Sequence, residues 1–392
     1  MEKIRLGDAC EILNGFAFKS ENYVDSGIRV IRIANVQKGY IEDNTPAFYP
    51  LDSVELDKYM LEEGDLLISL TGNVGRVAIL EKEFLPAALN QRVACLRLKT
   101  SRLTKGYLFH ILNGNLFEQQ CIQSSKGVAQ KNMSTEWLKN YEIPLYSKEK
   151  QDVITEILDK TYNVIFCRQQ EIQKLDDLIK ARFVEMFGDL ANPECSWDKS
   201  KLIDVCTDKD DIKCGPFGTQ LNKDEYIESG IAVWEIPQIN AAFLINPTHF
   251  LTEEKAEQLK AYTIIPGDIA MSRKGNVGKC ALFPDNYPEG IIHSDVLRIR
   301  VDRKRINPLF MMCQLHFSGS VTRQIELVSS GAIMAGVNVT KLKQIYVHVP
   351  PIELQNQFAD FVHQVDKSKV VVHKALEKTQ LLFDSLMQQY FG

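Results

Sequence analysis

Gly64-Asp65-Leu66-Leu67-Ile68-Ser69-Leu70-Thr71-Gly72-Asn73-Val74-Gly75 returns 203 residues later as Gly267-Asp268-Ile269-Ala270-Met271-Ser272-Arg273-Lys274-Gly275-Asn276-Val277-Gly278. Residues 23–28 (Tyr-Val-Asp-Ser-Gly-Ile) and 226–231 (Tyr-Ile-Glu-Ser-Gly-Ile) match at the same spacing. Repeats of about 20–50 residues build solenoids, whereas a period of about 200 residues is the length of a whole domain. The sequence therefore predicts a duplicated domain, with two similar but non-identical modules in one chain.

Length and composition are those of an ordinary globular protein with room for two domains. The 392 residues are 45% hydrophobic and 25% charged, which is typical of soluble domains. No apolar run approaches the roughly 18 residues that span a bilayer, and the first residues lack the apolar core of a secretory signal. Nine cysteines without a Cys-x-x-Cys pair indicate reduced thiols. We therefore expect a cytoplasmic protein.

The net charge of −5 limits how this chain could bind nucleic acid. Residues 1–150 carry 19 basic and 19 acidic side chains, and residues 189–354 carry 18 basic and 21 acidic ones. Neither module is therefore basic overall. Binding to phosphates would need local patches of Lys and Arg, or partners that carry most of the positive charge.

Both modules show the same order of apolar stretches. In residues 1–150 we expect strands at 28–33, 66–70, 76–80 and 93–98, and a helix at 103–123. In residues 189–354 we expect strands at 232–236, 268–272 and 296–301, and a helix at 308–327. The predicted fold class is α+β, with a mixed α/β module built on a twisted sheet and used twice.

A segment without Pro or Gly follows each module, at 151–187 and 355–391. The apolar residues alternate spacings of four and three, which is the a/d pattern of a coiled coil. Helices of this length would span roughly 55 Å. The predicted seam residues are Ile154, Leu158, Ile165, Ile172, Leu175, Ile179, Phe358, Val362, Val365, Val372, Leu376, Phe383 and Leu386.

A long helix with one apolar seam needs a partner, and this chain supplies two of matching length. We expect spacer helices at 151–188 and 355–392 that pair as an antiparallel coiled coil, with the modules related by a pseudo-twofold axis. The alternative is that each helix packs back on its own module.

The sequence contains almost no catalytic signature. It has no Walker A motif, no Asn-Pro-Pro-Tyr-like segment, no His-Glu-x-x-His pair and no Gly-x-Ser-x-Gly elbow. A loose nuclease-like spacing at Asp285, Asp302 and Lys304 could hold Mg²⁺, but the first module has Lys82 and Lys99 at equivalent positions. We predict no catalytic residue and no metal site, with a metal-dependent nuclease as the alternative.

The sequence offers more candidates for binding DNA than for catalysis. Glycines in the Gly-Asn-Val-Gly turns would let backbone N–H groups approach a phosphate, and a cation follows each turn; an ordinary sheet turn is the alternative. Amide, His and Arg side chains can read base edges. The candidates for DNA contact are Asn73, Arg76, Gln91, Arg92, Lys126, Gln130, Lys131, Asn222, Lys223, Arg273, Lys274, Asn276, Lys279, His293 and Ser294.

The doubled Gly-Asp-(Leu/Ile) strand with its Gly-Asn-Val-Gly turn, and the run Pro350-Pro351-Ile352-Glu353-Leu354-Gln355 before a long helix, resemble the specificity subunit of Type I restriction-modification systems. The order of module, short exit strand and helix, occurring twice, extends this resemblance over essentially the whole chain. Residues 146–150 (Tyr-Ser-Lys-Glu-Lys) depart from the Pro-Pro-Leu-Glu-Glu-like run that is usual in the family.

The resemblance implies two target-recognition domains, at 1–150 and 189–354, each reading one half of a bipartite, asymmetric site on double-stranded DNA. It implies that the paired helices act as a spacer and help to dock two methyltransferase (modification) subunits. Those partners would carry S-adenosylmethionine, and restriction subunits would use ATP and Mg²⁺, so no cofactor is expected in this chain.

Two other classes of protein are kept as alternatives to a non-catalytic DNA-specificity subunit. One is the metal-dependent nuclease or fused restriction enzyme that would use Asp285, Asp302 and Lys304. The other is a coiled-coil scaffold with two protein-binding modules, which would show no sequence preference on DNA.

Overall fold

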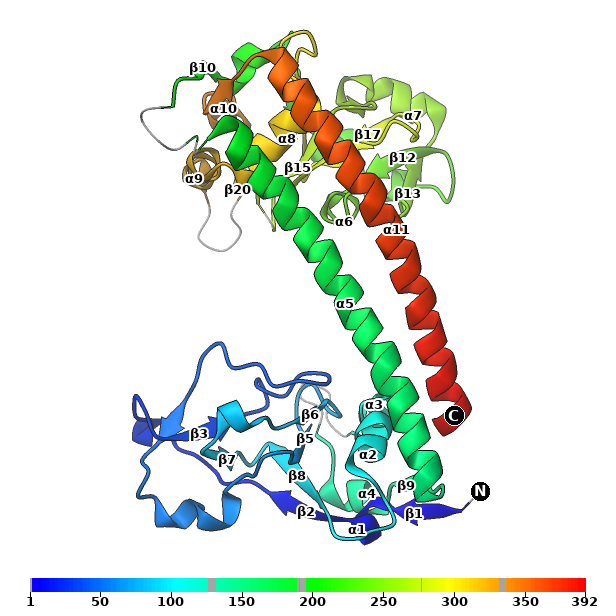
Figure 1. Ribbon diagram of the computed structural model, residues 1–392. Coiled ribbons are helices and arrows are strands. Elements are labelled where there is room, and N and C mark those ends of the chain that lie inside the picture. Colours follow the sequence, from blue (N-terminus) through cyan, green and yellow to red (C-terminus); the bar gives the residue numbers. More distant parts are fainter. Residues whose placement is uncertain (1, 126–131, 189, 191–194, 276, 331–335) are drawn as a thin grey trace. The chain divides into compact units, whose positions relative to one another are not determined.

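The computed structural model describes residues 2–125, 132–188, 190, 195–275, 277–330 and 336–392 (Figure 1). The chain divides into two compact units. Unit 1 is Met1–Gln169 with His373–Gly392, and unit 2 is Gln170–Val372. Each unit therefore contains one globular module and a part of both long helices.

Unit 1 is built on a four-stranded antiparallel sheet with the strand order β2-β8-β5-β6. In the smaller sheet β4-β3-β7, the strands β3 and β7 are parallel, and β1 pairs with β9. The strands are β1 Lys3–Arg5, β2 Cys10–Asn14, β3 Ile28–Ile31, β4 Phe48–Tyr49, β5 Leu66–Ser69, β6 Val77–Ile79, β7 Ala87–Leu89, β8 Val93–Leu98 and β9 Glu142–Pro144. The shorter helices are α1 Leu6–Ala9, α2 Lys105–Leu112, α3 Asn115–Ser124 and α4 Thr135–Asn140.

Both faces of the four-stranded sheet are covered, which explains why β5 is apolar at every position but its last. Leu66 and Ile68 belong to the core that includes α2 and α3, and Leu67 faces the smaller sheet on the other side. Figure 1 shows α2 and α3 on the side of the sheet that α5 approaches.

Unit 2 repeats this plan with the sheet β11-β18-β15-β16 and the smaller sheet β13-β12-β17-β14, and β10 pairs with β21. The strands are β10 Asp198–Lys201, β11 Ile212–Cys214, β12 Ile231–Trp234, β13 His249–Leu251, β14 Thr263–Ile264, β15 Ile269–Ser272, β16 Cys280–Leu282, β17 Gly290–Ile292, β18 Val296–Ile299, β19 Ser329–Ser330, β20 Gly336–Val337 and β21 Tyr346–Val349. The shorter helices are α6 Ile236–Asn240, α7 Glu253–Gln258, α8 Pro308–Phe317, α9 Gly319–Leu327 and α10 Val339–Leu342.

The strand register is the same in the two units. Ser69 pairs with Val93 across β5 and β8, and Ser272 pairs with Val296 across β15 and β18. Residues that are 203 positions apart in the sequence therefore occupy equivalent backbone positions in the two units. The predicted duplicated α+β module is confirmed.

The prediction of one helix at 103–123 and one at 308–327 is wrong, because each segment forms two helices. Gly114 has extended backbone between α2 and α3, and Ser318 has it between α8 and α9. A Cβ atom at Gly114 would lie 2.7 Å from Cε of Met387 in the C-terminal helix. The absence of a side chain therefore lets that helix pack close to the break.

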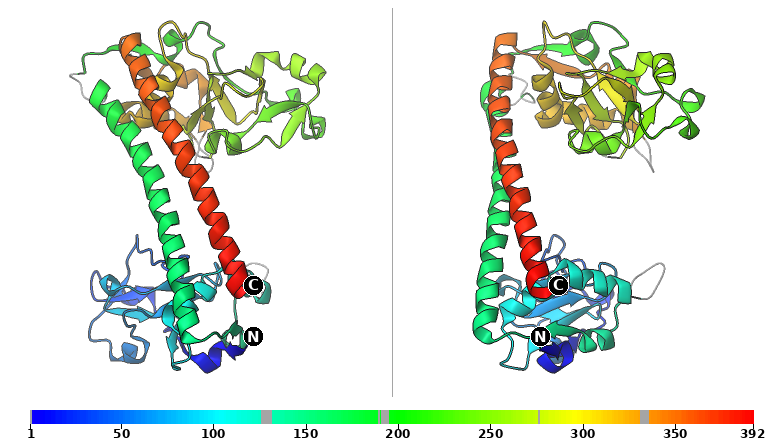
Figure 2. Two further views of the ribbon diagram at one scale, coloured as in Figure 1. Left: turned by 45° about the vertical axis from the view of Figure 1, so that its right-hand side comes forward. Right: turned by 90° about the vertical axis from the view of Figure 1, so that its right-hand side faces the viewer.

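The two long helices are α5 Lys148–Phe187 and α11 Ile352–Phe391, each starting three residues earlier than predicted. In unit 1 the rings of Tyr162 and Phe383 lie 6.3 Å apart, and Tyr146, just before α5, donates from its hydroxyl to Tyr390 O over 3.3 Å. In unit 2 the rings of Phe187 and Phe358 lie 5.6 Å apart, and Lys369 Nζ lies 2.6 Å from Asp176 Oδ1. Partner numbers in α11 fall as those in α5 rise, so the helices are antiparallel within each unit, as Figure 2 also shows.

The predicted seam residues line this helix pair. Within unit 1, Ile154, Leu158 and Ile165 are buried, and Leu376, Phe383 and Leu386 are half-buried. Within unit 2, Ile179, Phe358, Val362, Val365 and Val372 are buried, and Ile172 and Leu175 are half-buried. The predicted helix pairing is confirmed, and the alternative in which each helix packs only on its own module is wrong.

Candidate DNA-recognition surface

The Gly-Asn-Val-Gly turn joins β5 to β6 and needs both of its glycines. Gly72 and Gly75 have φ of 71° and 85°, in the left-handed region that favours glycine. Gly75 N–H donates to Ser69 O over 2.9 Å, which closes the turn. These contacts account for the glycines as parts of a sheet turn, and contact of the turn with a phosphate stays a prediction.

Replacing Gly75 by alanine should destabilise unit 1 more than the same change at Gly72. A Cβ atom at Gly75 would lie 2.8 Å from Cβ of Cys121 in α3, whereas at Gly72 the nearest atom is 3.8 Å away. We expect a loss of about 2–4 kcal/mol for Gly75→Ala and about 1–2 kcal/mol for Gly72→Ala. Urea unfolding of both variants measures the difference, and equal losses would contradict the packing role of Gly75.

Three segments meet at the end of the sheet where this turn lies. In unit 1, Leu70 N–H donates to Arg92 O over 3.0 Å, and Met133 N–H donates to Leu70 O over 2.8 Å. Thr71 also pairs with Asn132. We call residues 70–76, 90–92 and 132–133 the rim of unit 1.

Unit 2 has the same backbone arrangement. Arg273 N–H donates to Asp295 O over 2.9 Å, and Val337 N–H donates to Arg273 O over 3.0 Å. Lys274 pairs with Gly336 as Thr71 does with Asn132. We call residues 273–275, 277–279, 293–295 and 336–337 the rim of unit 2.

The side chains on the two rims carry different charges. In unit 2, Lys274 Nζ lies 2.8 Å from Asp295 Oδ1. The Arg273 guanidinium lies over the ring of Phe217, 4.8 Å from its centroid, and Nε donates to Val337 O over 3.2 Å. In unit 1 the equivalent positions hold Leu70, Thr71 and Arg92.

The structure brings most of the DNA-contact candidates to these rims. Arg76 donates a hydrogen bond to Gln37 Oε1, and Asn222 and Lys223 are not among the rim residues but lie at the start of the short helical turn Lys223–Glu225. Exposed candidates are Asn73, Gln91, Arg92, Asn222, Lys223 and Lys279; half-buried ones are Arg76, Arg273, Lys274, His293 and Ser294. Lys126, Gln130, Lys131 and Asn276 lie outside the described residues.

Two residues at the unit 2 surface were missed from the sequence: Asp295 on the rim, and Phe217, which contacts a rim residue. Phe217 lies under Arg273, and Asp295 pairs with Lys274. No local pattern points to either contact, because the partners are 56 and 21 residues apart in the chain.

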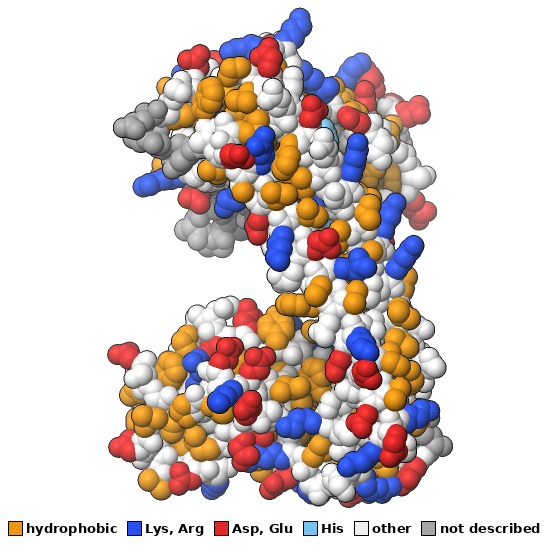
Figure 3. Space-filling model, viewed as in Figure 1, with side chains coloured by type: hydrophobic (Ala, Val, Ile, Leu, Met, Phe, Trp, Pro, Cys, Tyr) orange, Lys and Arg blue, Asp and Glu red, His pale blue; other side chains and the backbone are white. Residues whose placement is uncertain are grey.

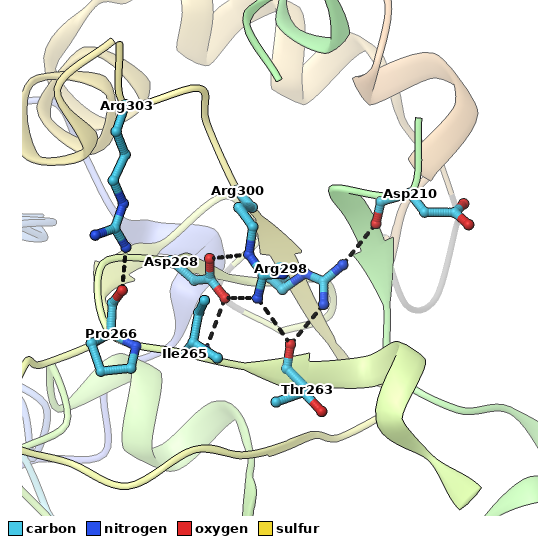
Figure 4. A network of polar contacts seen from close by, with 8 residues as sticks. All are labelled: Asp210, Thr263, Ile265, Pro266, Asp268, Arg298, Arg300 and Arg303. Carbon is cyan, nitrogen blue, oxygen red and sulfur yellow. Dashed lines mark hydrogen bonds and ion pairs between the residues drawn. The ribbon is translucent and has the colours of Figure 1, made fainter. Parts of the chain in front are cut away.

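The repeated Gly-Asp pair before β5 and β15 has a structural role. Asp65 accepts hydrogen bonds from Arg97 Nε and Nη2 over 2.9 and 2.7 Å and from Glu62 N–H over 2.8 Å. In unit 2, Asp268 makes the same bidentate pair with Arg300, at 2.7 Å twice, as Figure 4 shows. Hydrogen bonding to the aspartate raises the pKa of each arginine.

Unit 2 adds a second arginine to this network. Arg298 is buried in β18, where unit 1 has Cys95, and donates to Thr263 O and Asp210 O over 2.6 and 2.7 Å (Figure 4). Burial, together with the nearby Arg300, lowers the pKa of Arg298. The unit 2 sheet thus holds two cations close to a single fully buried carboxylate.

A buried glutamine fixes each long helix to its module. Gln151 is 0% exposed, accepts a hydrogen bond from Thr104 N–H, and donates to Arg102 O and Tyr146 O, all within 2.9 Å. Since Thr104 is the N-cap of α2, the amide connects the starts of two helices.

Gln355 makes the same three bonds in unit 2. It is also 0% exposed, accepts from Asn307 N–H over 2.9 Å, and donates to Arg305 O and Pro350 O over 3.2 and 2.7 Å. Asn307 is the N-cap of α8. In each unit, therefore, the amide oxygen of the glutamine accepts one hydrogen bond from the backbone and the amide nitrogen donates two, so the buried amide is satisfied in the same way twice.

The stability of unit 1 should fall as the pH drops below about 6.5. His110 in α2 is buried, its Nε2 lies 2.7 Å from Asp159 Oδ1 in α5, and burial lowers its pKa despite that contact. Because the folded-state pKa lies below the unfolded one, the unfolded chain binds more protons as the pH falls, and stability is lost. Unfolding measured between pH 7.5 and 5 should show a smaller loss for His110→Gln; an unchanged slope would contradict this role.

Among the described residues, no group of three or more His, Cys, Asp or Glu side chains comes together as a metal site would require. Asp302 Oδ1 accepts a hydrogen bond from Lys304 N–H over 3.0 Å, which is a turn contact. On the face shown in Figure 3, Lys and Arg are interspersed with Asp and Glu in both units. None of the described helices is long and apolar enough to cross a bilayer.

Comparisons with a family model and with known proteins point to the same family. Residues 1–177 and 195–381 match the Type I restriction modification DNA specificity domain. The Type I restriction enzyme EcoBI specificity subunit of Escherichia coli is 24% identical over 417 residues, covering 99% of this chain and 85% of that protein.

Solved structures share the fold. The S subunit of a Type I restriction-modification system from M. genitalium has a TM-score of 0.58 at 16% identity, covering 100% of this chain and 96% of the other. A chain from a structural study of type I R-M system assembly has a TM-score of 0.53 at 16% identity, covering 99% and 97%. These matches do not support the nuclease or scaffold alternatives. Because the specificity domain matches both halves over most of their length, the chain belongs to the DNA specificity subunits of Type I restriction-modification systems.

Proposed function

We propose that units 1 and 2 each recognise one half of a bipartite, asymmetric site on double-stranded DNA. The observation that carries this proposal is the pair of rims: the backbone contacts are the same, but Leu70, Thr71 and Arg92 are replaced by Arg273, Lys274 and Asp295. Equivalent surfaces with different hydrogen-bonding groups suit two related ligands that differ in sequence. A palindromic site would not need this difference.

The paired helices are the proposed spacer between the half-sites. Each is a continuous helix of 40 residues, which corresponds to roughly 60 Å. Each is anchored at its start by a buried glutamine and is antiparallel to the other within each unit. Rigid linkage makes binding of the second half-site intramolecular, so that two weak interactions give one selective complex.

The chain itself is proposed to be non-catalytic and to act in the cytoplasm with partner subunits. Two methyltransferase subunits would bring S-adenosylmethionine, and restriction subunits would bring ATP and Mg²⁺. The net charge of −5 and the interspersed surface charges favour weak, salt-sensitive DNA binding by this chain alone. The partners would then supply much of the positive charge.

Lengthening both long helices by one heptad at facing positions should change the preferred gap between half-sites. The half-site sequences should stay the same, because the rims are unaltered. The measurement is selection of bound sequences from a randomised DNA library by the complex with its methyltransferase subunits. An unchanged gap would refute the spacer role, and the absence of any base preference would refute DNA recognition.

A further inference from the structure

One position on the rim of unit 2 holds a charged residue where unit 1 holds an apolar one. Leu70 is buried at the edge of the main core of unit 1, and Arg273 occupies the equivalent backbone position in unit 2. A guanidinium at the edge of an apolar core has to be desolvated in part, which is unfavourable unless it gains a partner. The substitution therefore marks a position at which the two rims differ in chemistry, with an apolar side chain in unit 1 and a guanidinium in unit 2.

Two contacts hold the Arg273 guanidinium in one orientation. Its Nε donates to Val337 O over 3.2 Å, and its Cζ lies over the ring of Phe217, 4.8 Å from the centroid. Phe217 is 46% exposed, so this cation–π pair lies at the surface. Among the described residues, the hydrogen bond of this side chain is made by Nε, and no hydrogen bond of its two Nη groups is found.

The nearby carboxylate on the rim is engaged elsewhere. Asp295 lies 2.8 Å from Lys274 Nζ, and among the described residues it makes no ion pair with Arg273. Lys274 therefore has an acidic partner on the rim, whereas the described contacts of Arg273 are with an aromatic ring and a backbone carbonyl. Of these two adjacent cations, Arg273 is the one suited to bidentate recognition.

We propose that Arg273 recognises a guanine in the half-site bound by unit 2, donating from its two Nη groups to O6 and N7 in the major groove. This inference rests on the proposed function and adds the base and the residue that reads it. Arginine is the side chain best matched to the two acceptors of guanine, and each such pair discriminates by about 1–3 kcal/mol. Phe217 is a positioning residue that holds the fork before DNA binds.

The test uses the full chain in complex with its methyltransferase subunits and a randomised DNA library, with bound sequences read by sequencing. Arg273→Leu, which places the unit 1 residue at this position, should reduce the preference for guanine at one position of one half-site by roughly 5- to 150-fold, the range that corresponds to 1–3 kcal/mol. Arg273→Lys keeps the charge but not the fork and should lose most of that preference. Phe217→Leu should lose part of it.

Lys279→Gln is the matched control, because Lys279 is an exposed cation on the same rim. It should weaken binding to all sequences about equally and leave the base preferences unchanged. Selection of the other half-site by each variant reports whether the complex is intact.

The outcomes separate this inference from the proposed function. A wild-type guanine preference in Arg273→Lys would overturn the bidentate contact, and loss of the whole half-site in both arginine variants would assign Arg273 a structural role instead. If the wild-type complex selects no bipartite sequence, the proposed function fails and this inference fails with it. Bipartite selection that is unchanged in every Arg273 variant would overturn this inference alone.

Discussion

Replacing Gln355 by leucine is expected to lower the free energy of unfolding of unit 2 by about 3–4 kcal/mol. The change would leave Asn307 N–H and the carbonyls of Arg305 and Pro350 without the partner that the structure gives them. These groups surround a side chain that is 0% exposed, so water cannot replace the amide without rearrangement. Hydrogen exchange followed by mass spectrometry would locate the loss at the starts of α8 and α11.

The duplication provides the control variants for this experiment. Gln151→Leu should destabilise unit 1 by a similar amount, because its three bonds are the same. Gln357, which is exposed on α11, should tolerate leucine within about 0.5 kcal/mol. A loss at Gln355→Leu no larger than at Gln357→Leu would contradict the anchoring role of the buried amide.

Asp268→Ala is the second change with a large expected effect. It should lower the free energy of unfolding of unit 2 by about 3–5 kcal/mol. Asp268 is fully buried and holds Arg300 through two bonds of 2.7 Å, with Arg298 close by (Figure 4). Removing the carboxylate would leave two partly desolvated guanidinium groups near each other without the acceptor that holds Arg300, and only more distant carboxylates such as Asp211 would offset their charge. Urea unfolding followed by the fluorescence of Trp234 in unit 2 would measure the loss.

Comparison with unit 1 tests the part that Arg298 has in this effect. Asp65→Ala affects a single arginine, Arg97, which keeps its ion pair with Glu62, and Cys95 occupies the position of Arg298, so we expect a smaller loss than for Asp268→Ala. Asp302→Ala, which removes a turn contact, should cost less than about 1 kcal/mol. Equal losses of stability for Asp65→Ala and Asp268→Ala would show that Arg298 does not contribute to the effect of removing Asp268.

The duplicated architecture and the helix pair could be predicted from sequence because they depend on periodicity. The a/d spacing gives the buried face of a helix directly, and a repeated motif gives equivalent backbone positions. The break at Gly114 was missed because apolar spacing continues across it, and the break depends on packing against Met387 far along the chain.

The roles of single residues were harder to predict, since they depend on contacts between distant segments. The sequence marks Asp65 and Asp268 as repeated, but it does not indicate that each pairs with an arginine 32 residues later. Gln151 and Gln355 likewise bond to residues almost 50 positions away. The contact between Phe217 and Arg273 belongs to the same class, because neither residue has a local pattern that would pair them.

The division of both long helices between the units has a consequence for the order of events on the ribosome. Unit 2 is a continuous stretch, Gln170–Val372, whereas unit 1 is completed only by His373–Gly392. The module made before unit 2 therefore waits for a segment made after unit 2, and the core of unit 1 stays without Phe383, Leu386 and Tyr390, which pack against it, until that segment is made. During translation the second module can finish folding before the first, and premature termination near residue 372 would leave the earlier module with an uncovered apolar stripe.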